Sequence, residues 1–262
     1  MDKKKVAIRY TQHNGIKLAL EKIIKFHPIT YKIYSLVKQK FLGSLFVEED
    51  LKGIDKLDLD PNTKCIDVGA NTGQSIEYFK KRFKEIYAFE PNPSSFEILK
   101  KRYKKYQSIK LYNYALGNTT EEKTLYIPYW KNLISMHQSA SLYKEESIST
   151  LVEFLSLKKT DITIRTSVIK IVKLNAFNIS NVSLVKIDSE GYEKEVLEGM
   201  TNYLEKGVDI IIENSERSFN FSKNFLEKFG YQCYRFHNNS FTKKNIEEAL
   251  NLFFLKKNPN IK

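Results

Sequence analysis

The sequence predicts an α/β fold with a mainly parallel sheet and helices on both faces. From Cys65 onward, short β-rich runs alternate with stretches of helical periodicity, which is the pattern of parallel strands joined by crossover helices. Most of the strand-like runs are almost continuously apolar, as strands buried on both faces are. Hydrophobic residues make up 42% and charged residues 28% of the 262 residues, a composition typical of a globular domain with a full core.

The expected elements of the sheet follow in chain order. Strands are predicted at residues 65–68, 86–90, 109–115, 182–187 and 208–213. A helix with Ile76 and Phe79 on its apolar side should follow the first strand, and a second helix should begin near Pro93, a residue suited to the first helical position. The last strands, near residues 231–236 and 250–256, are expected to form a closing antiparallel hairpin.

Two segments interrupt the alternation. Residues 1–60 carry helical patterns and predict an N-terminal helical cap on a domain of residues 61–262. Residues 119–180 contain β-like stretches around a serine-rich piece, and they are too long for an ordinary crossover connection. Long insertions at the ligand edge of such sheets are often lids or substrate-binding elements. We therefore interpret residues 119–180 as a substrate-binding insertion.

Charge and targeting signals restrict the partners and the location. The formal charge of +12 would attract anionic partners such as nucleic acid, phospholipid headgroups or charged glycans, although a solubilising lysine surface explains it equally well. Lysine-rich helical patterns before residue 60 suggest weak contact with an anionic membrane, with packing on the core as the favoured alternative. No signal peptide or spanning segment is recognisable, so a cytoplasmic protein is expected. The sequence does not indicate an oligomeric state.

Cys65 and Cys233 lie within expected strands and lack the spacing of a metal or redox motif. We expect both to be reduced structural thiols.

The stretch KCIDVGANTGQSIEYF, residues 64–79, joins an apolar run, the acid Asp67, a glycine-spaced turn and a helical pattern. In open α/β sheets, ligands lie beyond the carboxyl ends of the strands. Gly69, Asn71 and Gly73 would allow close backbone approach and would place a helix N-terminus against the ligand. The turn therefore predicts a cofactor site for a dinucleotide, a nucleoside triphosphate or S-adenosylmethionine.

The acids near this turn favour S-adenosylmethionine. A pyrophosphate beside Asp67 would cost about 1 kcal/mol or more, and no Gly-Lys-Ser/Thr sequence follows for a triphosphate. An ammonium and a sulfonium would instead be attracted to Asp67. Glu90, at the end of the next strand, could accept the ribose hydroxyls, and Ala115 with its neighbours should line the adenine. The alternative is that Asp67 and Glu90 are turn-capping acids.

Four motifs together resemble the FkbM family of S-adenosylmethionine-dependent methyltransferases, over about residues 65–215. They are DVGANTG (67–73), FEPNP (89–93), YALGN (114–118) and LVKIDSEGYEKEVLEG (184–199). The resemblance implies a class I methyltransferase, Rossmann-like fold and O-methylation, commonly of sugar hydroxyls in glycans, glycolipids or natural products.

The resemblance also implies roles for individual residues. The positions that match the cofactor motifs are Asp67, Gly69, Asn71, Gly73 and Glu90. The positions that match the Ile-Asp-x-Glu-Gly-x-Glu signature are Asp188, Glu190, Gly191 and Glu193. One departure is Leu174-Asn175, where the family often has Leu-Asp, so no role for an acid carries over to position 175.

Methyl transfer needs a group that accepts the proton of the acceptor hydroxyl. Asp188 and Glu190 follow the strand at residues 182–187 and are the expected catalytic residues, with Asp188 favoured as the proton acceptor. Glu190 could alternatively cap the following helix, and capping is the favoured role of Glu193. His137, within the insertion, is a rival base because the ordinary pKa of a histidine side chain lies near neutrality.

A metal-assisted reaction is a further alternative. Asp188 with Glu213 and Asn214 offers oxygen ligands suited to magnesium, although a divalent metal is not favoured. The sequence thus predicts an O-methyltransferase that acts on a hydroxyl of a sugar, glycan or glycolipid. Nucleic-acid methylation is disfavoured because no Asn-Pro-Pro-Tyr-type motif or RNA-binding module is recognisable. A non-catalytic nucleoside-binding protein is the remaining alternative.

Overall fold

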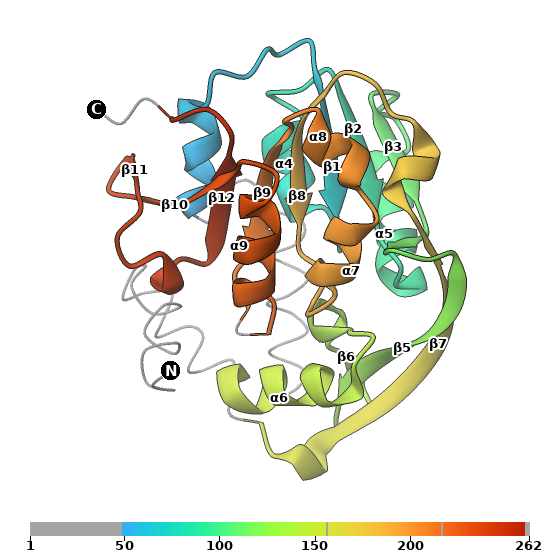
Figure 1. The fold of residues 1–262 in the computed structure, drawn as a ribbon. Helices are drawn as coiled ribbons and strands as arrows, with labels where there is room; N and C mark the ends of the chain where they lie inside the picture. The colour runs from blue at the N-terminus through green and yellow to red at the C-terminus, as the bar shows by residue number, and fades with distance from the viewer. Residues whose placement is uncertain (1–48, 156, 216, 260–262) are drawn as a thin grey trace.

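The structure is a computed structural model that describes residues 49–155, 157–215 and 217–259 (Figure 1). Most of the predicted N-terminal cap, including the lysine-rich helical patterns for which membrane contact and packing on the core are the alternatives, lies outside these residues. The described part of that segment begins with a 3₁₀-helix, η1 (Glu49–Lys56). Within the described ranges, no helix combines the length and the apolar character needed to cross a membrane.

The main sheet has the strand order β11-β10-β12-β9-β8-β1-β2-β3. Neighbouring strands from β9 to β3 pair in parallel, whereas β12 lies antiparallel between β9 and β10. This arrangement confirms the predicted Rossmann-like α/β fold. The strands are β1 (Lys64–Val68), β2 (Glu85–Phe89), β3 (Ile109–Tyr112), β8 (Val182–Ile187), β9 (Asp209–Glu213), β10 (Gln232–His237), β11 (Ser240–Thr242) and β12 (Asn251–Leu255).

The chain returns from β3 to β8, which lies beside β1 on the side opposite β2. The strand order therefore reverses at β1, and the connections after β1 and β8 diverge to opposite sides. Such a switch point opens a crevice at the carboxyl ends of the strands. The acids Asp67 and Asp188 lie at this point, one near the end of β1 and the other directly after β8.

The expected closing hairpin is only partly correct. β10 and β12 do pair antiparallel, but β11 and the 3₁₀-helix η5 (Ile246–Glu248) separate them in the chain. β12 also pairs with β9, and all of its residues are buried. A fully buried strand needs neighbours on both sides, which explains its place inside the sheet.

The expected strand at residues 109–115 is wrong in its second half. β3 ends at Tyr112, and the side-chain amide of Asn113 donates to the carbonyl groups of Glu90 and Pro91, at 2.8 and 3.1 Å. Ala115 and the next residue form β4 (Ala115–Leu116), which pairs with β7 in a different sheet. The apolar pattern continues through this change of sheet and therefore does not reveal it.

Helices cover both faces of the main sheet, and Figure 1 shows α7, α8 and α9 in front of it and α4 and α5 behind. Each face has its own apolar cluster, with Leu197 and Leu226 in one and Phe79 and Leu99 in the other. Asn92 caps α5, and Pro93 takes its first turn as predicted. The helices are α4 (Gln74–Phe79), α5 (Pro93–Tyr103), α7 (Glu193–Glu198), α8 (Thr201–Glu205) and α9 (Phe219–Glu227).

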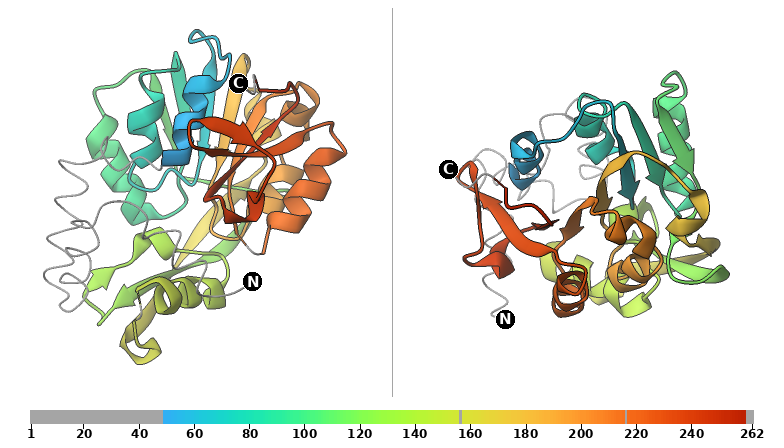
Figure 2. Two further views of the ribbon diagram at one scale, coloured as in Figure 1. Left: turned by 90° about the vertical axis from the view of Figure 1, so that its left-hand side faces the viewer. Right: turned by 45° about the horizontal axis from the view of Figure 1, so that its top comes forward.

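The insertion forms a second sheet with the order β4-β7-β5-β6. Its long strands β5 (Glu121–Trp130) and β7 (Ile162–Val172) pair antiparallel, so both β-like stretches are confirmed. The serine-rich piece between them contains α6 (Lys144–Leu155), which the sequence did not predict. The remaining elements are β6 (Ile134–Ser135) and the 3₁₀-helices η2 (His137–Ser139), η3 (Lys159–Asp161) and η4 (Leu174–Phe177). Figure 2 shows this sheet and α6 at one end of the main sheet.

We predict that Leu151→Ala loosens the attachment of α6. Leu151 is buried in a small cluster with Trp130, Ile134 and Met136. The substitution should lower the free energy of unfolding by about 2 to 5 kcal/mol through lost burial and a residual cavity. Denaturant unfolding measures this change. The matched control is Val152→Ala at the next, exposed position, and an equal effect of both substitutions would show that the cluster does not hold α6.

Candidate active site

The glycine turn after β1 contains three residues in the left-handed region, with φ of 78° at Gly69, 49° at Asn71 and 90° at Gly73. A Cβ atom on Gly69 would lie 1.7 Å from the carbonyl oxygen of Asp188, and one on Gly73 would lie 2.5 Å from the ring of Tyr103. The protein's own packing therefore requires both glycines. Close approach of a ligand, the reason expected from the sequence, is not needed to explain them.

Glu90 ties this turn to the end of β2. Its carboxylate is buried and accepts the backbone N–H of Asn71 at 2.7 Å and that of Asn92 at 2.8 Å. Burial raises the pKa of Glu90 to about 7, although the two N–H groups act in the opposite direction. The carboxylate retains lone pairs that can accept hydroxyl groups.

Asp67 lies completely buried beneath the turn, and Ser75 of α4 donates to its Oδ2 at 2.6 Å. Burial raises the pKa of Asp67, while the Lys186 ammonium lowers it. Among the described residues, its Oδ1, the Oδ1 of Asn71 and the Oγ1 of Thr72 have no hydrogen-bond partner. A ligand with an ammonium group and hydroxyl donors fits these unpaired polar atoms, as S-adenosylmethionine would.

Ala115 occupies a different place from the one expected. It is buried in the core, and its backbone pairs with Ile171 of β7 instead of ending the third strand of the main sheet. The side chain that ends β3 is Tyr112, whose ring stacks on Phe89 with ring centroids 4.9 Å apart. Contact between Ala115 and the adenine stays a prediction.

Asp188 joins the ends of two strands. Its backbone N–H donates to the carbonyl of Val68 at 3.0 Å, and its Oδ2 accepts from the ammonium of Lys186 at 2.9 Å. Burial raises the pKa of the Asp188 carboxyl, but Lys186 and a hydrogen bond with Glu213 outweigh burial and hold the pKa below its ordinary value. The site therefore presents an ionised carboxylate directly after β8.

Lys186 is a residue of this site that the sequence analysis missed. It is buried within β8, between Val185 and Ile187. A lysine inside an otherwise apolar strand was the available signal, because lysine is almost never fully buried unless it is paired.

Glu190 is also close to Asp188. Asp188, Glu190 and Glu213 each place one carboxylate oxygen within 4.8 Å of the other two. Burial and the charges of Asp188, Glu193 and Glu146 raise the pKa of Glu190 well above its ordinary value. Glu190 consequently keeps its proton to a higher pH than Asp188 does, a separation typical of paired catalytic carboxyl groups.

Glu193 organises the loop between these acids and α7. Its Oε1 accepts the backbone N–H groups of Ser189 and Gly191, at 3.2 and 3.0 Å, and the hydroxyl of Ser189. This geometry supports a structural role for Glu193. Glu190 has φ of 50°, and its carbonyl, held in the same loop, accepts from the Ser141 hydroxyl at 2.8 Å.

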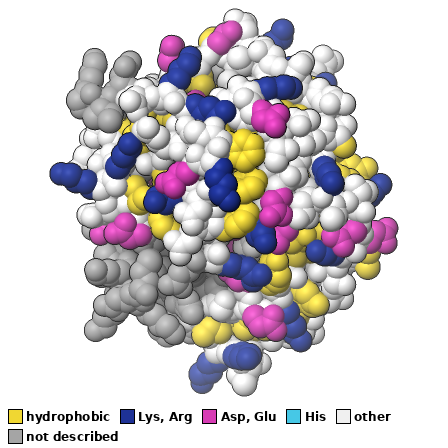
Figure 3. Space-filling view, in the orientation of Figure 1, with side chains coloured by type: hydrophobic (Ala, Val, Ile, Leu, Met, Phe, Trp, Pro, Cys, Tyr) yellow, Lys and Arg dark blue, Asp and Glu magenta, His cyan; other side chains and the backbone are white. Residues whose placement is uncertain are grey.

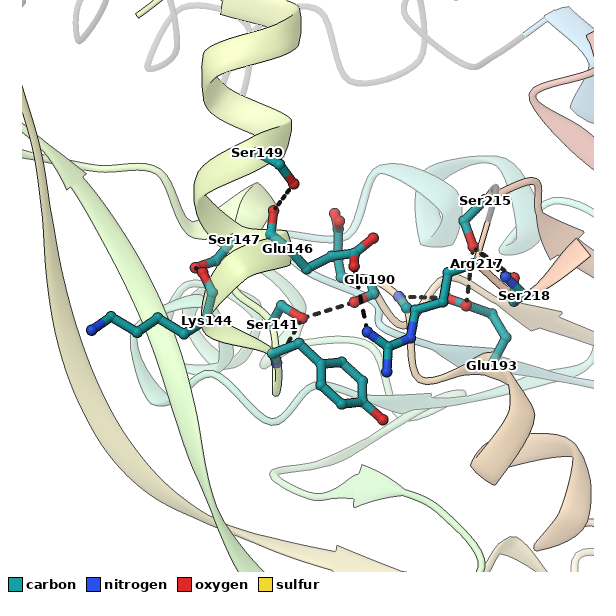
Figure 4. Close-up of polar contacts among 12 residues, drawn as sticks. Ser141, Lys144, Glu146, Ser147, Ser149, Glu190, Glu193, Ser215, Arg217 and Ser218 are labelled. Carbon is teal, nitrogen blue, oxygen red and sulfur yellow. Dashed lines mark hydrogen bonds and ion pairs between the residues drawn. The ribbon is translucent and has the colours of Figure 1, made fainter. Parts of the chain in front are cut away.

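The insertion borders this loop, as Figure 4 shows. Besides the contact from Ser141, Glu146 at the start of α6 lies 3.6 Å from Arg217, between Oε2 and Nη1. The Arg217 guanidinium lies 3.5 Å from the ring centroid of Tyr143. The rival base His137 lies in η2, where burial lowers its pKa and its Nδ1 is 3.5 Å from the Ser135 carbonyl.

The cluster of carboxylates from Asp188, Glu190 and Glu213 is a poor magnesium site in this arrangement. The Lys186 ammonium already supplies a positive charge to Asp188 and would repel a metal ion. Asn214, an expected ligand, donates its side-chain amide to the carbonyl groups of Ala249 and Glu247, at 2.9 and 3.2 Å. We assign no metal ligand.

Residues 67–233, more than half of the chain, match the family described as the Methyltransferase FkbM domain. "Methyltransferase 1" of Beauveria bassiana (strain ARSEF 2860) is 24% identical over 179 residues, which are 63% of this chain and 71% of that protein.

Two solved structures are similar to this chain. Methyltransferase FkbM from Methylobacillus flagellatus KT has a TM-score of 0.49 and 17% identity, over 76% of this chain and 44% of that one. The chain thus spans less than half of the length of that protein. TrmK from M. capricolum, solved with S-adenosyl-homocysteine, its natural cofactor product, has a TM-score of 0.40 and 15% identity, over 81% of this chain and 69% of that one.

We predict that the affinity for S-adenosylhomocysteine decreases as the pH is lowered, because Glu90 becomes protonated. With a pKa of about 7, the carboxylate loses charge, and with it strength as an acceptor for ribose hydroxyls, as the pH falls. The dissociation constant should rise up to about tenfold between about pH 8 and pH 6 if only the ionised form binds. Calorimetry at several pH values measures the change.

Two variants provide the controls. Glu90→Gln should bind more weakly at every pH and should lose the pH dependence. Glu85→Gln, at the opposite end of β2, should retain the response of the unmodified protein. A pH response that persists in Glu90→Gln would remove Glu90 from the cofactor site.

Proposed function

The chain belongs to the FkbM family of methyltransferases, and we propose that it transfers the methyl group of S-adenosylmethionine to a hydroxyl of a sugar, glycan or glycolipid. The observation that carries this proposal is the position of the Asp188 carboxylate, which pairs with Lys186 directly after β8, beside the glycine turn and in the loop that the insertion contacts. A hydroxyl acceptor needs such a proton-accepting group.

The cofactor pocket is assigned to the ends of β1 and β2. Glu90 would accept the ribose hydroxyls, and the unpaired Oδ1 of Asp67 would attract the ammonium group. The turn from Gly69 to Gly73 would lie against the ligand between these acids. When bound, S-adenosylmethionine supplies an electrophilic methyl group on a sulfonium.

Asp188 is the proposed proton acceptor because it is ionised at a lower pH than Glu190. The ion pair with Lys186 and the hydrogen bond with Glu213 limit the rotation of its carboxylate. Glu190 is the alternative acceptor, since a raised pKa makes it the stronger base once it is ionised. Either residue would hold the proton that leaves the acceptor hydroxyl.

The insertion is the proposed acceptor-binding element. Ser141 donates to the Glu190 carbonyl, and Tyr143 and Glu146 contact Arg217 of the loop after β9. Aromatic and planar polar groups beside the carboxylates suit a polyhydroxylated acceptor, which offers both apolar C–H surfaces and hydroxyl donors. They would also limit the access of water to the reacting atoms.

Nucleic-acid methylation is the second candidate because the formal charge is +12. Figure 3 shows lysine and arginine side chains interspersed with acidic ones on the face it displays, a distribution that favours a solubilising surface over a basic track. A nucleoside-binding protein without turnover is less well supported, since Asp188 and Glu190 lie together at the site.

The choice of acceptor can be tested directly. Tritiated methyl from S-adenosylmethionine should enter glycan and glycolipid extracts and should leave RNA from the same cells unlabelled. The control is the Asp188→Asn variant, which should label neither pool. Label in RNA alone would overturn the proposal, and cofactor binding without label in any pool would indicate a binding protein.

We predict that Asp188→Asn slows the methyl-transfer step by roughly 10²- to 10⁴-fold, because the amide keeps the shape but cannot accept the proton. The dissociation constant of the cofactor should change little. If Glu190 has a structural role, Glu190→Gln should lower the free energy of unfolding by at most about 0.5 to 2 kcal/mol and should change the methyl-transfer rate little. Single-turnover transfer across pH, with calorimetry, measures both.

The opposite pattern would reassign the base. A near-normal rate in Asp188→Asn with a collapsed rate in Glu190→Gln would place the proton on Glu190. Activity of Asp188→Asn that depends on added magnesium would instead support the metal alternative that the Lys186 ion pair disfavours.

A further inference from the structure

Lys186 is a cation buried in the middle of the main sheet. Lys186 is only 4% exposed, and it lies in register with Asp67 of β1 and Ile211 of β9. Its Nζ lies 2.9 Å from the Oδ2 of Asp188. A buried ammonium is costly unless a charge or hydrogen bonds compensate it. Asp188 provides this compensation, but the presence of a lysine at this buried position still needs an explanation.

Acidic groups reach this cation from several elements. Asp67 lies beside it in β1, with Cys65 two residues earlier on the same face of that strand, and Asp188 contacts it from the loop after β8. Burial raises the pKa of Cys65, Asp67 and Glu190, and the Lys186 charge acts in the opposite direction on all three. Glu213 at the end of β9 is hydrogen-bonded to Asp188. Glu90 and Glu193 are further acids of the site, and burial together with the Asp188 charge raises the pKa of both.

We propose that Lys186 is a positioning residue that fixes the orientation of Asp188 and keeps it ionised, and that its charge also balances Asp67 beneath the cofactor turn. This role deepens the proposed function, on which it rests, by assigning a residue that joins the acceptor side of the site to the cofactor side. Lys186 acts through these two acids.

An alternative structural role would not require a charge. Leu184, two residues earlier on the same face of β8, and Ile211, beside Lys186 in β9, show that this face accommodates buried apolar side chains. An apolar side chain of similar volume would avoid the desolvation of an ammonium, and buried ion pairs are often replaced in this way without loss of stability. We therefore attribute the presence of the lysine to its effect on the orientation and ionisation of Asp188.

The test is a ¹³C NMR titration of the full chain labelled at aspartate Cγ, with the Asp188 signal identified by its loss in Asp188→Asn. In Lys186→Met, we expect the Asp188 titration to move upward by about one pH unit or more, as the loss of a close opposite charge does. Lys186→Arg keeps the charge and should move it by much less. An unchanged titration in folded Lys186→Met would overturn the proposal.

Two further measurements complete the test. If Lys186→Met unfolds, the neutral pair Lys186→Met with Asp188→Asn should restore the unfolding midpoint, whereas failure to restore it would contradict the pairing. In the active enzyme, the rate lost in Lys186→Met at neutral pH should recover as the pH rises, and an equal loss at every pH would contradict the role. The NMR titration needs neither cofactor nor acceptor, so it distinguishes failure of this inference from failure of the proposed function.

Discussion

The structure depends on the compensation of buried and half-buried carboxylates at the carboxyl edge of the main sheet. Each such charge would be costly in an apolar core, and each is compensated by a different partner. Asp67 accepts from Ser75, Glu90 accepts two backbone N–H groups, Asp188 pairs with Lys186, and Glu193 accepts from the loop before α7. These partners fix the turns that would surround the ligand.

Backbone hydrogen bonds also connect the turns of the site to the neighbouring strands. The turn after β1 is held to β2 by hydrogen bonds from Gly69 and Ala70 to the Phe89 carbonyl, at 2.9 and 3.0 Å. The loop after β8 is held to β1 through the N–H of Asp188. The groups proposed to bind the cofactor and to accept the proton are thus connected through backbone, which holds geometry more precisely than long flexible side chains do.

The second sheet adds the part of the site that distinguishes this chain from a bare α/β domain. Its strands are anchored in the core through Leu125 and Ile171, while Ser141 contacts the loop after β8 and Glu146 contacts the loop after β9. The anchored strands provide a fixed base, and the polar contacts at the loop can be exchanged for contacts with an acceptor. This division suits an element that selects a substrate.

The sequence by itself determined the alternation of strands and helices, the glycine turn, and the placement of Glu90 and Asp188 at strand ends. These features follow from local periodicity and from residues close together in the chain. The tertiary structure alone decided that residues 109–115 divide between two sheets, that β12 enters the main sheet, and that Lys186 lies beside Asp67 of β1. Those outcomes arise from pairing and electrostatic contacts between segments far apart in sequence, which no local pattern encodes.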